Sequence, residues 1–401
     1  MNAPAGPKGW NATAHTLWGR GERNAAFQSL LEDINRHGPK KPAPLVKQLS
    51  YYAFLTGNPA AAAGFLEATY PYYPDDFELL LNLAVCLSRS GKHAQAIGHL
   101  EKLRTMDPAS VVVWDSLAAC CHAVGRDAEA AQAGTQALVL KDKQPRPQAP
   151  AWQAPADIAA ALKQADQGRR VVAFSLWGAN PRYLLGALDN ALALPKVYPG
   201  WQAVFFVEES VPADLRQALA ELGADVRVQQ PDQGQRQKLA WRFLVANEAG
   251  VGRFLVRDVD SVVNDRERAA VDAWLASQAL FHVMRDWWTH TDLVLAGMWG
   301  GVAGVLPPIA PLLTAYNPQH METPNVDQWF LRDILWPCLR QSVLAHDRLF
   351  TPPGAQPWPL PAPAGNLHVG QDVHAVARAE QVQRLAPWIA RIPSLQPGGA
   401  T

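Results

Sequence analysis

The sequence has few cysteines and no net charge, and these two features exclude several classes of protein. Only four cysteines occur among 401 residues, and their spacing fits neither a zinc site nor a disulfide framework. They are Cys86, Cys120, Cys121 and Cys338. Lysine plus arginine and aspartate plus glutamate each number 36, and no basic run breaks this balance. The zero net charge argues against nucleic acid or an anionic membrane surface as the main partner.

The chain also lacks a long apolar run. No stretch approaches the ~20 apolar residues of a transmembrane helix, and the first residues do not resemble a secretory signal. We therefore expect a cytoplasmic protein with no integral membrane segment. Because 401 residues exceed what one hydrophobic core normally holds, we expect two domains.

A repeat with a period of 34 residues runs through the first third of the chain. Four sets of residues keep this spacing: Gly57, Gly91 and Gly125; Leu49, Leu83 and Leu117; Ala60, Ala94 and Ala128; and Ala62, Ala96 and Ala130. The period resembles that of tetratricopeptide repeats, in which glycine ends the first helix of each pair and alanine allows close helix packing. We therefore expect an N-terminal tail over 1–24 and an all-α repeat domain over 25–143.

Stacked helix pairs form a superhelix with a concave face, which commonly binds a protein or an extended peptide. A dimerisation or stabilising module is the structural alternative. The proline-rich residues that follow predict a semi-rigid linker over 144–167, and residues 168–401 form the second domain.

Strands alternate with helices in the second domain, which predicts an α/β fold with a mostly parallel sheet. The apolar patterns place strands at 169–177, 204–207, 225–228 and 253–256, and helices at 181–194, 211–222 and 235–248. Ligands of such sheets bind at the carboxyl ends of the strands.

Two aspartates, Asp258 and Asp260, directly follow the strand expected at 253–256. Carboxylate oxygens are the ligands that Mg²⁺ and Mn²⁺ prefer. An enzyme that uses a nucleotide sugar needs such a cation, because the departing diphosphate carries several negative charges. Asp258 and Asp260 are therefore the predicted metal ligands, and solvated loop acids are the structural alternative.

In this context the second domain resembles the GT-A class of glycosyltransferases, which combine a half-Rossmann domain with an Asp-x-Asp motif. It is closer still to bacterial and viral GT-A-like proteins of mostly unassigned activity. The resemblance rests on six blocks, at 174–183, 198–201, 257–261, 281–286, 297–300 and 327–337. It implies a fold of the half-Rossmann type and a nucleotide-diphosphate sugar as the donor substrate.

A second resemblance, to retaining transferases of the glycogenin-like kind, implies roles for later residues. Gly297 opens a block of small residues near the donor sugar, Asp327 and Gln328 lie beneath that sugar, and His368 completes the metal site. The Asp327–Gln328 pair favours retention of anomeric configuration. His368 is followed by Val-Gly where the family has two residues before glycine, and an ordinary polar residue is the alternative.

Other candidates are cations, aromatics and one further acid. Arg257 and Arg285 offer bidentate forks to phosphate or carboxylate, with a structural ion pair as the alternative. Lys238 and Arg242 are four residues apart on one helix face, where they could meet the diphosphate or stay solvated. Asp286 could orient a sugar hydroxyl or accept a proton. The donor-site set is completed by Ser175, Trp177 and Trp299.

These patterns together predict a metal-dependent glycosyltransferase of the hexosyltransferase type. We expect it to move a sugar to a protein or peptide acceptor that the repeats recruit. The alternatives are a surface glycan or lipid-linked acceptor, and an inactive scaffold that acts through protein–protein interaction. We expect Asp258, Asp260, Arg285, the block 297–300 and Asp327 to converge on one cleft at the carboxyl ends of the sheet strands.

Overall fold

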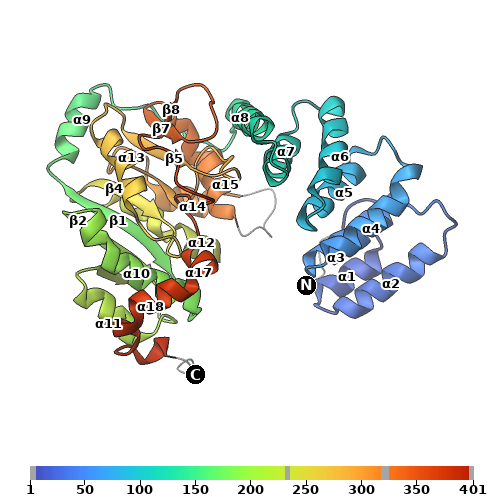
Figure 1. Cartoon of the computed structure of the whole chain (residues 1–401), viewed down its shortest axis with the longest axis horizontal. Helices are drawn as coiled ribbons and strands as arrows, with labels where there is room; N and C mark the ends of the chain where they lie inside the picture. Colours follow the sequence, from blue (N-terminus) through green and yellow to red (C-terminus); the bar gives the residue numbers. More distant parts are fainter. Residues whose placement is uncertain (1–5, 231–234, 318–324, 397–401) are drawn as a thin grey trace. The chain divides into compact units, whose positions relative to one another are not determined.

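The computed structural model describes residues 6–230, 235–317 and 325–396 (Figure 1). The chain forms two compact units, residues 1–140 and residues 141–401. In the described ranges, no helix combines the length and the apolar character needed to cross a membrane.

The first unit is built from consecutive helices that pack in pairs (Figure 1). They are α1 (Ala12–Gly19), α2 (Arg23–Asn35), α3 (Ala43–Leu55), α4 (Pro59–Thr69), α5 (Phe77–Arg89), α6 (His93–Met106), α7 (Val111–Ala123) and α8 (Asp127–Lys143). The short 3-10 turn η1 (Tyr70–Tyr72) follows α4. The end of α8 belongs to the second unit.

The repeated residues perform the roles that their spacing predicts. The three glycines follow the first helix of successive pairs and have left-handed φ values: Gly57 79°, Gly91 80° and Gly125 78°. Side chains rarely adopt this conformation, so glycine is the residue that ends each helix there. The alanines Ala62, Ala96 and Ala130 are all 0% exposed and allow the helices to approach closely. The predicted helical repeat is confirmed.

The prediction of a tail over residues 1–24 is wrong, because residues 12–19 form helix α1. Asn11 caps this helix by accepting a hydrogen bond from the Ala14 amide at 2.8 Å. Trp18 stacks on the buried ring of Tyr52 with a centroid distance of 4.0 Å. The N-cap and the aromatic contact make α1 part of the helical array rather than a tail.

The second unit contains an eight-stranded mixed sheet in the order β3-β2-β1-β4-β6-β5-β7-β8. Only β6 runs antiparallel to its neighbours β4 and β5; the other described pairings are parallel. The strands are β1 (Arg169–Leu176), β2 (Trp201–Val207), β3 (Asp225–Val228), β4 (Val251–Arg257), β5 (Phe281–Arg285), β6 (Met298–Val302), β7 (Val343–Asp347) and β8 (Ala355–Pro357).

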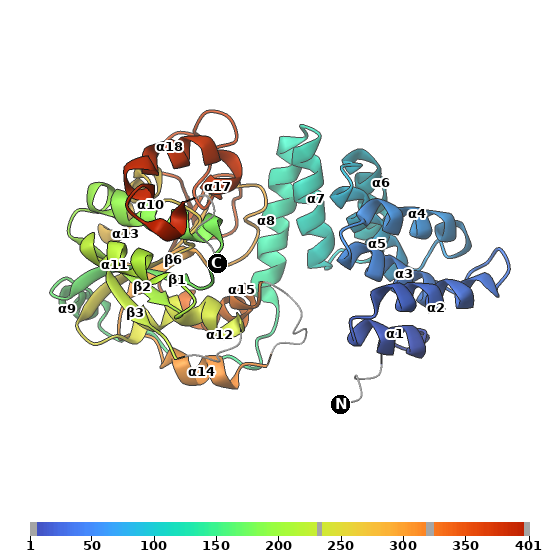
Figure 2. The same cartoon turned by 90° about the horizontal axis from the view of Figure 1, so that it is seen from below.

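Helices cover both faces of this sheet, with α10 and α12 on opposite sides (Figure 2). The α-helices of this unit are α9 (Ile158–Ala165), α10 (Pro181–Val197), α11 (Ala213–Glu221), α12 (Gln235–Ala240), α13 (Asp265–Leu275), α14 (Ile309–Ala315), α15 (Val326–Phe330), α16 (Trp336–Leu339), α17 (Val373–Val376) and α18 (Arg378–Ile389). The 3-10 segments are η2 (Trp241–Asn247) and η4 (Pro393–Leu395), and η3 (Leu331–Leu335) is a π-helix. All four predicted strands are present. The helix predicted over 235–248 is instead α12 followed by η2.

The predicted linker over 144–167 is not a free spacer, because it packs on the second unit. The Trp152 indole donates a hydrogen bond to the carbonyl of Val305 at 3.0 Å. The side chain of Gln341 binds the same segment twice, at the Trp152 carbonyl and at the Ala154 amide, with distances of 3.1 and 3.0 Å. A proline-rich pattern predicts the extended backbone but not these side-chain contacts.

Candidate functional site

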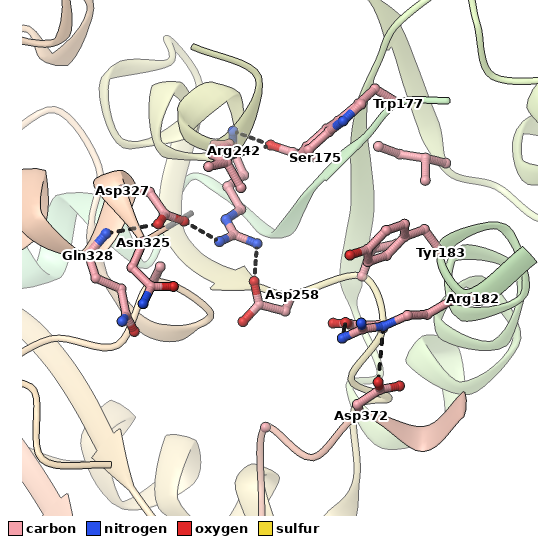
Figure 3. A pocket seen from close by; sticks show the side chains of 16 residues that line it. Ser175, Trp177, Arg182, Tyr183, Arg242, Asp258, Asn325, Asp327, Gln328 and Asp372 are labelled. Carbon is pink, nitrogen blue, oxygen red and sulfur yellow. Dashed lines mark hydrogen bonds and ion pairs between the residues drawn. The ribbon is translucent and has the colours of Figure 1, made fainter. Parts of the chain in front are cut away.

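A pocket of about 380 Å³ lies where strands β1 and β4 end (Figure 3). Segments far apart in the sequence supply its walls: Ser175–Trp177, Arg182, Tyr183, Leu239, Arg242, Asp258–Asp260, Ala296, Asn325, Asp327, Gln328, Gly370 and Asp372. The pocket therefore occupies the carboxyl ends of parallel strands, where ligands bind in open α/β sheets.

Helix α10 holds the backbone of the loop that carries Asp258 and Asp260. The buried Asn190 amide donates to the carbonyls of Val259 and Ser261 at 3.1 and 3.0 Å, and its oxygen accepts from the Val263 amide at 3.1 Å. One turn earlier, Gly186 lies so close to the loop that a Cβ there would overlap the Val259 carbonyl oxygen. The glycine and the asparagine together fix the path of the loop.

Replacing Gly186 with alanine is expected to destabilise the second unit by about 1–3 kcal/mol, because an added methyl group must displace backbone. The measurement is urea unfolding followed by tryptophan fluorescence. Gly98→Ala is the matched control, since Gly98 also lies in a helix but has no atom within 4 Å of the added Cβ. An increase in stability at Gly186, as expected for Gly98, would contradict the tight packing of helix and loop.

Arg242 is buried between two carboxylates of the pocket (Figure 3). It donates from Nη1 to Asp258 at 2.5 Å and from Nη2 to Asp327 at 3.1 Å. Its backbone amide donates to the Ser175 hydroxyl at 3.1 Å. Burial lowers the pKa of the guanidinium, but the charges of Asp258 and Asp327 outweigh this and hold the pKa above its ordinary value. Arg242 therefore orients two acids at the wall of the pocket. Its contact with a diphosphate stays a prediction.

A second arginine, Arg182, pairs with the other acids of the pocket. Its Nη2 lies 2.5 Å from Asp260 Oδ2, and its Nε lies 3.0 Å from Asp372 Oδ2. Burial raises the pKa of Asp260, and the nearby charges of Asp258 and Asp372 raise it further, while Arg182 lowers it. The loop therefore carries mutually repelling carboxylates, which a cation stabilises.

Gly297 and Gln328 lie next to acids of the pocket, Gly297 against Asp258 and Gln328 beside Asp327. A Cβ on Gly297 would overlap the Asp258 carboxylate, so this position needs glycine. Gln328 lines the pocket, and its backbone amide donates to Asp327 at 2.9 Å. Burial raises the pKa of Asp327, which Arg242 opposes. Ser175 and Trp177 line the pocket as well.

Arg257 and Trp299 were predicted to bind the donor but lie in the core of the sheet. Arg257 is 2% exposed and donates to Glu267 at 3.0 Å and to the carbonyl of Trp299 at 3.1 Å. Trp299 is fully buried, with its ring packed edge-on against Phe243 and Phe254. Neither side chain lines the pocket.

Arg285, Asp286 and Lys238 form ion pairs outside the pocket lining. Arg285 is buried and donates to Asp347 at 2.6 Å. The Asp286 carboxylate is fully buried, accepts from Arg266 and the Val369 amide, and forms an ion pair with Arg348. These contacts tie the end of β5 to the segment before Gly370. Lys238 pairs with Glu208. A structural ion pair, the alternative interpretation, therefore describes Arg285 and Asp286, whereas Lys238 forms an ion pair instead of staying solvated. The predicted cleft does not include Arg285.

His368 does not join the two aspartates. Its ring stacks on Trp287 with a centroid distance of 4.5 Å, and Nδ1 lies 3.0 Å from the Asn366 carbonyl oxygen. Burial lowers the pKa of this imidazole. Across residues 6–230, 235–317 and 325–396, no group of three His, Cys, Asp or Glu side chains is arranged to hold a metal ion.

Four polar or aromatic pocket residues were not predicted: Arg182, Tyr183, Asn325 and Asp372. The first two belong to the block 174–183 that carries the family resemblance, and Asn325 lies two positions before Asp327. Their position within or next to these sequence blocks is the signal that could have identified the three residues as part of the site. Nothing in the sequence near Asp372 indicates that it meets Arg182.

Comparison with known proteins identifies the repeats alone. Residues 53–120 match the tetratricopeptide repeat family. Similar solved structures include the MamA protein, at 21% identity over 32% of this chain and 70% of that chain, with a TM-score of 0.29. Another is YrrB, described as a tetratricopeptide protein with an unusual peptide-binding site, at 12% identity, 33% and 68% coverage and a TM-score of 0.31. MamA from Desulfovibrio magneticus RS-1 is 15% identical over 38% of this chain and 78% of that chain, with a TM-score of 0.30. No curated protein matches the chain.

Proposed function

We propose that the second unit is a GT-A-type glycosyltransferase that uses a nucleotide-diphosphate sugar with Mn²⁺ or Mg²⁺. One observation carries the proposal. Asp258 and Asp260 share a single pocket with Asp327 and Gln328, and that pocket lies at the carboxyl ends of parallel strands. The resemblance of the blocks at 257–261 and 327–337 to this class predicts that these four residues converge, whereas Arg285 and residues 297–300, which were expected in the same cleft, do not line the pocket.

The order of the strands supports a nucleotide site. The parallel strands β3-β2-β1-β4 have the order found in the nucleotide-binding half of doubly wound folds. Trp177 and Tyr183 line the pocket from the end of β1 and the start of α10. Aromatic faces at this position suit stacking on a base or on the apolar side of a sugar.

Two carboxylates are sufficient protein ligands for this chemistry. Mg²⁺ usually binds through one or two carboxylates, with water and substrate phosphate completing its shell. Asp258 and Asp260 fit this mode without His368, and their mutual repulsion favours a cation. When bound, the cation would neutralise charge on the departing diphosphate.

The remaining roles fall to residues that the structure orients. Both oxygens of Asp327 accept hydrogen bonds, one from Arg242 and one from the Gln328 amide. This carboxylate is therefore held in one orientation, suited to positioning a sugar hydroxyl. The Gln328 side chain lines the pocket and donates to Asp292 at 3.2 Å. We omit Asp286 from the catalytic set, because Arg266 and Arg348 enclose it.

A panel of nucleotide sugars, each incubated with Mn²⁺ or with a chelator, tests the proposal. We expect slow hydrolysis of one donor class, and only with the cation. Equal hydrolysis in the chelator would reject the metal, whereas no turnover of any donor would favour an inactive scaffold.

We further propose that the repeats recruit a protein or peptide acceptor, as the concave faces of such arrays commonly do. A chain that starts at Asp127 removes α1 to α7 but keeps α8, whose end belongs to the second unit. Donor hydrolysis should stay unchanged, because the pocket residues all lie in the second unit. Transfer to the natural acceptor should fall about tenfold or more, because the binding that holds the acceptor near the sugar is lost.

Parallel assays of hydrolysis and transfer on both chains provide the measurement. Equal transfer by the shortened chain would show that the repeats serve another purpose, such as dimerisation. Transfer to a glycan or lipid-linked acceptor by both chains would favour that class of acceptor.

A further inference from the structure

Arg182 occupies a position in the pocket that neither the metal nor the donor assignment explains. It lies in the first turn of α10, and its side chain is 40% exposed. Its guanidinium contacts the carboxylates of Asp260 and Asp372, which come from the β4 end and from the segment before α17. The Val373 amide also donates to the Asp260 carbonyl, at 3.1 Å, so the two segments are held together. Arg182 therefore supplies positive charge at one of the two proposed metal ligands.

The other arginine of the pocket cannot replace it. Arg242 is 4% exposed and is held by Asp258, Asp327 and the Arg257 carbonyl, which together engage both of its terminal nitrogens. Arg182 pairs with Asp260 and Asp372, and its side chain is 40% exposed, so it can release Asp260 while it keeps its contact with Asp372. Guanidinium binds phosphate oxygens with the same bidentate geometry as carboxylate oxygens.

We propose that Arg182 is an exchangeable counter-ion, which neutralises Asp260 when no cation is bound and moves to the phosphates of the donor when a divalent cation binds. The inference rests on the proposed cation at Asp258 and Asp260. A cation that binds alone competes with the guanidinium for Asp260 and leaves Arg182 paired with Asp372 only. A cation that arrives with a diphosphate gives Arg182 a new partner. Metal and diphosphate therefore bind cooperatively, and the coupling is reciprocal.

The test measures Mn²⁺ binding to the full chain from the electron paramagnetic resonance signal of free Mn²⁺, with and without inorganic pyrophosphate. Free Mn²⁺ is corrected for its pyrophosphate complex. In Arg182→Gln, Mn²⁺ alone should bind about tenfold more tightly than in the natural protein, because the competing charge-assisted hydrogen bond is gone. Pyrophosphate should enhance Mn²⁺ binding less in this variant than in the natural protein.

Two further variants separate the exchange from general charge effects. Arg182→Lys keeps the positive charge and should bind Mn²⁺ alone like the natural protein. Arg268→Gln removes an equal charge from an exposed pair with Asp272, outside the pocket, and should change neither affinity. Thermal unfolding of each variant checks that the fold is retained.

The outcomes distinguish this inference from the proposed function. Equal affinity of the natural protein and Arg182→Gln for Mn²⁺ alone, combined with Mn²⁺-dependent hydrolysis of a nucleotide sugar, would overturn the exchange and leave the transferase proposal in place. Absence of Mn²⁺ binding in every protein, even with pyrophosphate, would overturn both the exchange and the metal assignment.

Discussion

Replacing Arg242 with methionine is expected to lower the free energy of unfolding of the second unit by about 3–5 kcal/mol, because it leaves buried charge without a partner. Asp327 is the acid most affected, since its side chain is 6% exposed and Arg242 is its cationic partner in the pocket. Asp258 is affected less, because its side chain is 44% exposed and water can solvate it. Methionine fills much of the same volume, so the loss reports on charge more than on packing.

Urea unfolding followed by tryptophan fluorescence measures this loss, because 12 of the 15 tryptophans lie after residue 150. The double variant Arg242→Met with Asp327→Asn should recover part of the lost stability, since it also removes the unpaired charge. Arg268→Met is the control and should cost less than Arg242→Met, because its ion pair with Asp272 is exposed and its hydrogen bond to the Val197 carbonyl leaves no buried charge behind. A loss below about 1 kcal/mol at Arg242 would show that water already reaches the Asp327 carboxylate.

Replacing Asp260 with asparagine is expected to reduce donor hydrolysis about a hundredfold or more, because a bound metal supplies several kcal/mol of charge stabilisation in the transition state. The fold should survive. Removing one of several repelling carboxylates offsets the loss of the bond to Arg182, and Asp372 still pairs with that arginine. Initial rates at saturating Mn²⁺, with the unfolding midpoint measured on the same sample, provide the result.

Asp272→Asn is the matched control for that experiment. It removes a carboxylate that pairs with Arg268 on the outer surface of α13, so hydrolysis should stay unchanged. Full hydrolysis by Asp260→Asn would remove this carboxylate from the catalytic machinery. A fall in rate that follows the unfolding midpoint would show that Asp260 acts through the fold.

The parts of the fold that depend on local patterns could be predicted from the sequence. The spacing of Gly57, Gly91 and Gly125 located three helix ends, because each glycine takes a left-handed conformation that depends on its own turn. The apolar patterns located β1 to β4 because this signal, too, depends only on neighbouring residues. The direction of β6 could not be predicted, because Met298–Val302 is equally apolar whether it pairs parallel or antiparallel.

The candidate site shows the same division between local and long-range information. Asp258 and Asp260 were found because they directly follow a strand. Arg257 and Arg285 were assigned to phosphate because their acidic partners, Glu267 and Asp347, become evident only when the chain is folded. A sequence shows that a cation is present but not which carboxylate it contacts, and this explains why Arg182 was missed.

The hydrogen bonds between helix α10 and the loop that carries Asp258 and Asp260 affect the entropy of ligand binding. Asn190 fixes the loop backbone through the carbonyls of Val259 and Ser261 and the amide of Val263, all of them buried from solvent by the helix. Ordering a flexible loop of this length would cost about 1–2 kcal/mol per residue at the moment of binding. The loop backbone is ordered before any ligand arrives, so the entropy of ordering it is lost during folding. Ligand binding then has to reorient side chains but not the backbone of the loop. The amide proton of Val263 should accordingly exchange with solvent at the slow rate of the sheet core rather than at the rate of a surface loop.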